Sequence, residues 1–333
     1  MRKIALLAAL VWAAAAAPSW ADCKMGRLGD LKPVIAHSRI YVPGKVNGKG
    51  VLFMVDSGAD TLLFAAEAAA IGISVGGYSG EGFGATGGVR SEGQATLASL
   101  EIGLWSGHDV ALRAVGSVGG ENLEGVPVIG VLGEDILSHF DVEIDVKGNR
   151  FSLFQMTGCE EANLAYWTET YNVVDIGHYD ARSPRLRLAG TLNDSPVSMI
   201  LDTGAPFSAV SLDVARALGV SPGGSGVEEI EKSSGVNGQA ETTWVGIFSS
   251  FALDQERIAP AKIRFFKFAQ ADAEIGTRLS RRAFAVDMFL GFDFIRAHHV
   301  MISHSQKKLY FSYSGGNPFP VPKSTAAPSN PAQ

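Results

Sequence analysis

The sequence has few cysteines, no surplus of basic residues and few long apolar runs. Only two of its 333 residues are cysteines, which excludes a small scaffold held together by many disulfides. Lys and Arg number 28 against 34 Asp and Glu, giving a formal net charge of −6. Because polyphosphate partners need a basic face, this balance argues against a nucleic-acid partner. Serine-hydrolase and P-loop chemistry have no starting motif, since neither Gly-x-Ser-x-Gly nor Gly-Lys-Ser/Thr occurs.

The composition indicates a folded, β-rich protein. Apolar residues make up 46% of the chain and charged residues 19%, enough to build cores and too few charges for wholesale disorder. The chain also has 39 glycines and 14 prolines, which favour turns and short strands over long helices. The length predicts two compact units.

The first residues are typical of an export signal. Residues 4–17 form an apolar run after a short basic start, and Ser19 and Ala21 suit the −3 and −1 positions of a cleavage site before Asp22. A membrane anchor is the alternative, but fourteen residues fall short of the roughly 20 needed to span a bilayer. We therefore expect a signal peptide at 1–21 and an exported protein, periplasmic or secreted, without membrane contact after cleavage.

The two cysteines are Cys23 and Cys159, and both remain after such a cleavage. In an oxidising compartment an even pair favours a disulfide, which would tie the beginning of the first half to its end. Two unrelated thiols are the alternative. Cysteine alone cannot build a metal site at this count.

The chain contains an internal repeat. Residues 40–59 align without a gap with residues 186–205, at a separation of 146. Both segments read as β-hairpins, with turns at Asn47-Gly48 and Asn193-Asp194. Short helices are expected after each segment, at 64–72 and 211–219. A second pair of similar blocks follows at 131–145 and 289–303.

The repeat divides the chain into parts. We expect an N-terminal lobe at 22–155, a connector at 156–171 and a C-terminal lobe at 172–316. Residues 317–333 contain five prolines and few large apolar residues, so we expect a disordered tail there.

One four-residue pattern ends the second strand of each hairpin: Asp56-Ser57-Gly58-Ala59 and Asp202-Thr203-Gly204-Ala205. Asp-Ser/Thr-Gly alone suits any tight turn. The full pattern should arise about 0.01 times by chance in such a chain, yet it occurs twice. With the later Leu132-Gly133 and Leu290-Gly291 blocks, it resembles the retropepsin-like aspartic peptidases. The resemblance implies an all-β fold of two retropepsin-like β-barrel lobes with short helices, related by pseudo-two-fold symmetry within one chain.

The resemblance also implies a catalytic pair, Asp56 and Asp202. Two carboxyl groups that share a proton can deprotonate water and protonate a carbonyl oxygen. Like charges so close cannot both ionise easily, so we expect coupled titration with one low and one raised apparent pKa.

The residues around the pair are expected to support it. By resemblance, the two hydroxyls bond to the opposite loop and the glycines bring N–H donors close to the carboxylates. Because the alanines offer no hydroxyl donor to the carboxylates, we expect an acidic to mildly acidic activity optimum rather than a strongly acidic one. The support residues are Ser57, Gly58, Ala59, Thr203, Gly204 and Ala205.

The family closes a β-hairpin flap over its substrate, and two glycine-rich segments, 76–88 and 233–239, are candidates by position. Mobile surface loops are the alternative for both. The candidate flap residues are Gly84, Thr86, Gly87, Gly235, Asn237 and Gly238.

Five further polar residues invite a functional interpretation. His298, His299 and His304 could suggest a metal, but adjacent imidazoles on a strand point to opposite faces, which favours surface or capping roles. Asp135 and Asp293 could extend the catalytic set, although capping of the following short helices is favoured.

The sequence thus predicts a monomeric aspartic endopeptidase that hydrolyses an extended polypeptide without cofactor or metal. The alternative is a non-catalytic peptide-binding envelope protein on the same fold, and a structural module of the envelope is a third. A binding protein would be expected to have lost one carboxylate, and neither is lost here.

Overall fold

The computed structural model describes residues 23–77, 81–84, 87–116, 121–177, 185–234, 240–268 and 286–321. Within these ranges strands dominate and the four helices are short, which confirms the predicted fold class. None of the described helices is long and apolar enough to cross a membrane. The predicted signal peptide at 1–21 lies outside the described residues.

The first repeat closes into a β-barrel. Its ring runs β3, β4, β10, β5, β8, β7, and β7 pairs back with β3. Asn47 and Gly48 turn the β3–β4 hairpin with φ of 49° and 77°, as two-residue Asn-Gly turns require. The strands of this lobe are β2 (Val34–Ala36), β3 (Arg39–Val46), β4 (Lys49–Asp56), β5 (Leu62–Phe64), β6 (Glu81–Gly84), β7 (Gly87–Ile102), β8 (Trp105–Val115), β9 (Asn122–Leu123) and β10 (Val126–Gly133).

The second repeat builds an equivalent ring in the order β14, β15, β22, β16, β21, β18. Here β19 continues β18 after a two-residue break and pairs back with β14. Asn193 and Asp194 form the matching turn, with φ of 51° and 59°. The strands are β14 (Arg187–Leu192), β15 (Ser195–Leu201), β16 (Ala209–Ser211), β17 (Glu228–Ser234), β18 (Ala240–Phe248), β19 (Phe251–Leu253), β20 (Glu256–Ile258), β21 (Ala261–Phe266) and β22 (Met288–Leu290).

The short helices occupy equivalent places in the two lobes. After the first Asp loop comes α1 (Ala65–Ala70), and after the second comes α3 (Leu212–Ala217). Ser211 caps α3 by accepting a hydrogen bond from the Val214 N–H at 3.3 Å, and Gly219 follows with a φ of 81°. Directly after β10 and β22 come α2 (Glu134–Leu137) and α5 (Phe292–Ile295).

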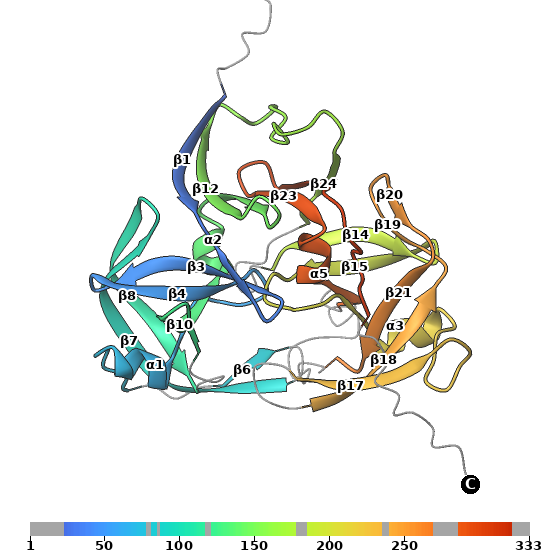
Figure 1. The fold of residues 1–333 in the computed structure, drawn as a ribbon, viewed down its shortest axis with the longest axis horizontal. Coiled ribbons are helices and arrows are strands. Elements are labelled where there is room, and N and C mark those ends of the chain that lie inside the picture. Colours follow the sequence, from blue (N-terminus) through green and yellow to red (C-terminus); the bar gives the residue numbers. More distant parts are fainter. Residues whose placement is uncertain are drawn as a thin grey trace, which may run out of the picture.

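A six-stranded antiparallel sheet joins the lobes, and Figure 1 shows the barrels to its left and right. At its centre β11 pairs with β23, so that Val142 lies opposite Ile302 and Ile144 opposite Val300. Because these four residues are equivalent in pairs between the repeats, the register itself is two-fold symmetric. The strand order is β1 (Lys24–Leu31), β12 (Arg150–Thr157), β11 (Asp141–Asp145), β23 (His298–Ser303), β24 (Lys308–Tyr313) and β13 (Asn172–Asp175).

Both ends of the described chain are fastened. A disulfide joins Cys23 to Cys159 at the end of the β1–β12 pair, as expected. At the other end Phe319 is only 3% exposed and packs edge-on against Phe251, with ring centroids 5.1 Å apart. The C-terminal lobe therefore extends beyond the predicted boundary at 316. The remainder of the predicted tail, 322–333, lies outside the described residues.

Candidate active site

The two aspartates of the repeated motif meet where the lobes meet. Asp56 is the last residue of β4, and Asp202 directly follows β15. In each lobe a parallel neighbour holds the strand end: Gly133 pairs with Asp56, and the Asp202 N–H donates to Leu290 O at 2.9 Å. The two carboxyl groups hydrogen-bond to each other.

Reciprocal hydrogen bonds lock the two loops together. The Ser57 hydroxyl donates to Leu201 O at 2.7 Å, and the Thr203 hydroxyl donates to Val55 O at 3.0 Å. Each hydroxyl oxygen also accepts the backbone N–H of the other residue, at 3.1 and 2.9 Å. Both side chains are buried. The loops therefore cannot separate without breaking four buried hydrogen bonds.

Gly58 and Gly204 pack directly on the opposite carboxyl group. A Cβ at Gly58 would lie 2.8 Å from Cγ of Asp202, and one at Gly204 would lie 2.3 Å from Cγ of Asp56. Both distances are too short for any side chain. These two positions need glycine because the other lobe occupies the space.

The two carboxyls accept different numbers of hydrogen bonds from backbone N–H groups. Asp56 Oδ1 accepts one N–H, from Gly58 at 2.9 Å, whereas Asp202 Oδ1 accepts two, from Gly204 at 3.0 Å and Ala205 at 2.9 Å. The Ala59 N–H donates instead to the main-chain oxygen of Asp56. Asp202 is therefore the better stabilised anion.

The pKa of each carboxyl follows this asymmetry. Burial, and then the negative charge of Asp202, raises the pKa of Asp56 well above its usual value. Burial also raises the pKa of Asp202, although the Ala205 N–H and the hydrogen bond from Asp56 oppose it. The sequence led us to expect one low value, whereas desolvation moves both upward.

A second polar layer lies behind each loop. Asp135 Oδ1 accepts both the N–H and the hydroxyl of Thr61, at 2.7 and 2.6 Å, and the Thr61 hydroxyl accepts the Gly133 N–H. Ser208 and Asp293 repeat this arrangement in the other lobe, at 2.8 and 2.6 Å. The predicted helix-capping role holds in part for Asp293, because its Oδ1 also accepts the Phe294 N–H in the first turn of α5 at 2.9 Å. The N-cap residues of α2 and α5 are glycines, and the aspartates brace the loops that carry the dyad.

Sequence reasoning missed a pair of arginines beside the dyad. Arg39 Nε donates to Gly204 O at 3.1 Å, and its charge lowers the pKa of Asp56 against the dominant effect of burial. Arg185 acts in the same direction on Asp202. The two arginines are 146 positions apart, so extending the repeat alignment by one residue would have found them.

The candidate flap residues are only partly described. β6 and β7 form a hairpin in which Gly84 pairs with Gly87 next to the turn. In the other lobe β17 pairs with β18, from Glu228 opposite Val245 to Ser234 opposite Ala240. Figure 1 shows β6 and β17 at the same lower edge of the molecule. Thr86, Gly235, Asn237 and Gly238 lie outside the described residues.

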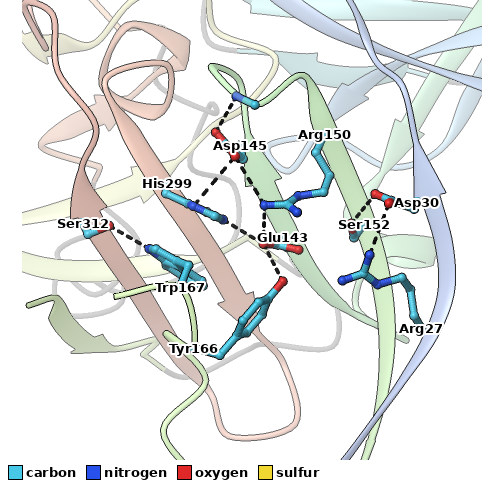
Figure 2. A network of polar contacts seen from close by, with 11 residues as sticks. Arg27, Asp30, Glu143, Asp145, Arg150, Ser152, Tyr166, Trp167, His299 and Ser312 are labelled. Atoms are coloured by element: carbon cyan, nitrogen blue, oxygen red, sulfur yellow. Dashed lines mark hydrogen bonds and ion pairs between the residues drawn. The ribbon is translucent and has the colours of Figure 1, made fainter. Parts of the chain in front are cut away.

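The three histidines are buried and each faces a carboxylate. His298 Nε2 lies 2.9 Å from Glu256, His299 Nε2 lies 2.8 Å from Glu143, and His304 Nε2 lies 2.6 Å from Glu134. Figure 2 shows His299 within a network in which the Tyr166 hydroxyl also donates to Glu143. The expected surface location was wrong, whereas the capping role holds for His298, whose Nδ1 contacts Phe294 O of α5 at 2.7 Å. In the described part of the chain no three potential metal ligands form a group.

Comparison with known proteins identifies a family whose model matches this chain. The family model described as "Aspartyl protease" matches residues 42–136 and 188–294, one segment in each repeat. Among solved structures the chain is similar to an aspartic proteinase from Irpex lacteus, at 11% identity and a TM-score of 0.47, covering 87% of this chain and 97% of that one. No curated protein matches the chain.

Proposed function

Because the chain belongs to the aspartyl protease family, we propose that it is an aspartic endopeptidase in which Asp56 and Asp202 activate a water molecule. One observation carries the proposal: two carboxyl groups, one from each lobe, share a hydrogen bond on loops locked to each other. Each segment that matches the family model contains one Asp loop and the Leu-Gly pair that follows it, which supports a site built from both repeats.

The asymmetry of the backbone donors to the dyad supports one assignment of the two roles. Asp202, held as the anion by two backbone N–H groups, accepts a proton from the water. Asp56, which carries the shared proton, donates it to the carbonyl oxygen of the scissile peptide bond. The water oxygen bonds to the carbonyl carbon and gives a diol. As the C–N bond breaks, Asp202 passes the proton that it took from the water to the leaving nitrogen, and one diol hydroxyl returns a proton to Asp56 as the carboxylic acid product forms. Neither a metal nor a covalent intermediate is needed.

The substrate is an extended polypeptide bound across the two lobes. The site lies at their junction, and the two hairpins β6–β7 and β17–β18 extend from the two lobes at one edge of the molecule. We propose that the protein works as a monomer, because one chain supplies both halves of the dyad. The raised pKa values support activity at acidic to mildly acidic rather than strongly acidic pH.

Cleavage of an unfolded protein between pH 3 and 7 tests the proposal. Asp56→Asn and Asp202→Asn should each abolish cleavage, and pepstatin should inhibit it. Asp213→Asn, an exposed aspartate on α3, is the matched control and should cleave at the wild-type rate. Cleavage that persists in both dyad variants would end the proposal. A wild-type protein that binds peptides without cutting them would favour the non-catalytic alternative.

We also propose that the mature protein is exported. The disulfide between Cys23 and Cys159 supports a non-reducing compartment. Mass spectrometry of the periplasmic and culture-medium fractions should find an intact disulfide and an N-terminus at Asp22. A reduced, full-length chain confined to the cytosol would contradict export.

A further inference from the structure

A buried ion pair crosses the lobe boundary behind the Asp56 loop. Glu134, on α2 of the N-terminal lobe, is 1% exposed, and its Oε1 lies 2.6 Å from Nε2 of His304, which follows β23 of the C-terminal lobe. The His304 ring also contacts Phe140 O through Nδ1. The pair thus joins two segments that lie 170 residues apart in the sequence.

The main chain of Glu134 holds the Asp56 loop. Its N–H donates to Ala59 O at 2.9 Å, three residues after the catalytic aspartate. The preceding Gly133 lies so close to this loop that an added Cβ would lie 2.4 Å from the same oxygen. Glu134 therefore contacts the Asp56 loop through its backbone and the other lobe through its side chain.

The equivalent position in the other lobe lacks this pair. In the repeat alignment Phe292 is equivalent to Glu134, and Val146 is equivalent to His304, each at a separation of 158 positions. The Phe292 N–H makes the same loop contact, to Ala205 O at 2.8 Å. Its side chain and Val146 line a cavity of about 310 Å³ between the lobes. The ionic connection behind the Asp56 loop therefore has no counterpart at the equivalent positions behind the Asp202 loop.

The surroundings of His304 keep its ring charged. Burial works to lower the pKa of His304, but Glu134, the Phe140 carbonyl and Asp141 outweigh it, so the pKa is raised. Glu134 and Asp141 are the charged groups that face the ring, from α2 and β11 respectively. Asp141 is itself held by Ser303 and Ser305 at 3.0 and 2.6 Å. His304 is therefore the cationic partner of the pair at the acidic pH where the proposed reaction runs.

We propose that His304 is a positioning residue that, through Glu134, fixes the Asp56 loop across the lobe boundary. This inference rests on the proposed function, because positioning matters for a dyad that performs chemistry. Since small displacements of reacting groups can cost roughly 100-fold in rate, a loosened loop lowers kcat more than it changes KM.

Three variants test this role. His304→Gln removes the charge. His298→Gln is the matched control, because it breaks the same kind of buried pair with Glu256 but entirely within the C-terminal lobe. The double variant Glu134→Phe with His304→Val places at this boundary the two apolar residues that the other lobe holds at the equivalent positions. If His304→Gln does not fold, Glu134→Gln takes its place, since its amide keeps an acceptor for His304.

We expect His304→Gln to lower kcat about tenfold or more with KM changed less than twofold. His298→Gln should lower the melting temperature and leave kcat unchanged, and the double variant should recover most of the lost kcat. The ¹³C titration of the Asp56 carboxyl should shift in His304→Gln and return in the double variant. Equal kcat values in the two histidine variants, with an unshifted Asp56 titration, would overturn the proposal. A folded double variant as slow as His304→Gln would overturn it too.

The titration separates this proposal from the proposed function. If Asp56→Asn cleaves as fast as the wild type, the endopeptidase assignment fails. The response of the Asp56 carboxyl to His304→Gln still decides whether the histidine positions the loop, because it is measured without substrate.

Discussion

At the scale of single residues, the carboxyl group of Asp56 in the other lobe leaves no space for a side chain at Gly204. A Cβ there would lie 2.3 Å from Cγ of Asp56, so any side chain displaces a catalytic carboxyl. Gly204→Ala should lower kcat/KM about 100-fold or more. Gly50→Ala is the control, because no atom lies within 4 Å of its added Cβ and its φ is ordinary, and it should stay within twofold of the wild type. Full activity of Gly204→Ala would contradict the packing described for the dyad.

Asp293 should make stability depend on pH. Burial raises its pKa from 3.8 to about 6. The folded state therefore favours the protonated form, and this contribution is complete below about pH 3.8 and lost as the pH rises to about 6. A rise of this size in the pKa corresponds to roughly 3 kcal/mol in the free energy of unfolding.

Asp293→Asn should remove that pH dependence while keeping an acceptor oxygen for Ser208. Urea unfolding between pH 3.5 and 7 measures it. Asp135→Asn, the exposed equivalent in the other lobe, should keep the wild-type profile. An Asp293→Asn profile parallel to the wild type would show that this carboxyl does not titrate in the range.

The sequence predicted the residues of the dyad loops but not their surroundings. Asp56 and Asp202 stand in a repeated local pattern that is visible by alignment. By contrast, the contact between His304 and Glu134 joins residues 170 positions apart, and no local pattern indicates it. The burial of these histidines depends on the meeting of the two lobes, which sequence periodicity does not encode.

At the scale of elements, the hydroxyl of Thr203 joins the two Asp loops. It donates to Val55 O and accepts from the Ser57 N–H, and both of these partners are in the other lobe. Thr203→Val should leave these buried groups unpaired and lower the free energy of unfolding by about 2 kcal/mol. Thr203→Ser keeps the hydroxyl and should lower the free energy of unfolding much less. Chemical denaturation compares the two, and equal losses would mean that the methyl group, not the hydrogen bonds, stabilises the contact.

Elements were predictable where their signals are local. Asn-Gly and Asn-Asp turns between alternating strands identified both hairpins, and Ser211 with Gly219 marked α3. The central sheet was not predictable, because β11 and β23 come from different lobes and their pairing follows only from the symmetry of the assembled repeats. The buried Phe319 was missed for a similar reason: a proline-rich tail gives no sign that its single aromatic residue packs against Phe251.

At the scale of the whole molecule, the central sheet holds the lobes together around a buried charge. Glu143 lies at the middle of β11 and is completely buried. Its Oε1 accepts from Tyr166 at 2.8 Å, contacts His299 at 2.8 Å and lies 3.5 Å from Arg150 (Figure 2). Burial works to raise the pKa of Glu143, but these partners together lower it below 4.5. The ionised form is therefore the one that the folded molecule stabilises.

This charge should limit stability on the acid side. A lowered pKa contributes stability above the unfolded value of 4.5, and that contribution is lost as the pH falls through the folded value. Glu143→Gln should thus cost about 3 kcal/mol at pH 7. The difference from the wild type should shrink steadily below pH 4.5, because the wild-type carboxyl then becomes neutral as well. Denaturant unfolding across pH 3 to 7 measures this difference, with the exposed Glu169→Gln as a control that should match the wild type throughout. A Glu143→Gln deficit that stays constant with pH would mean that the side chain contributes through packing and hydrogen bonding rather than through its charge.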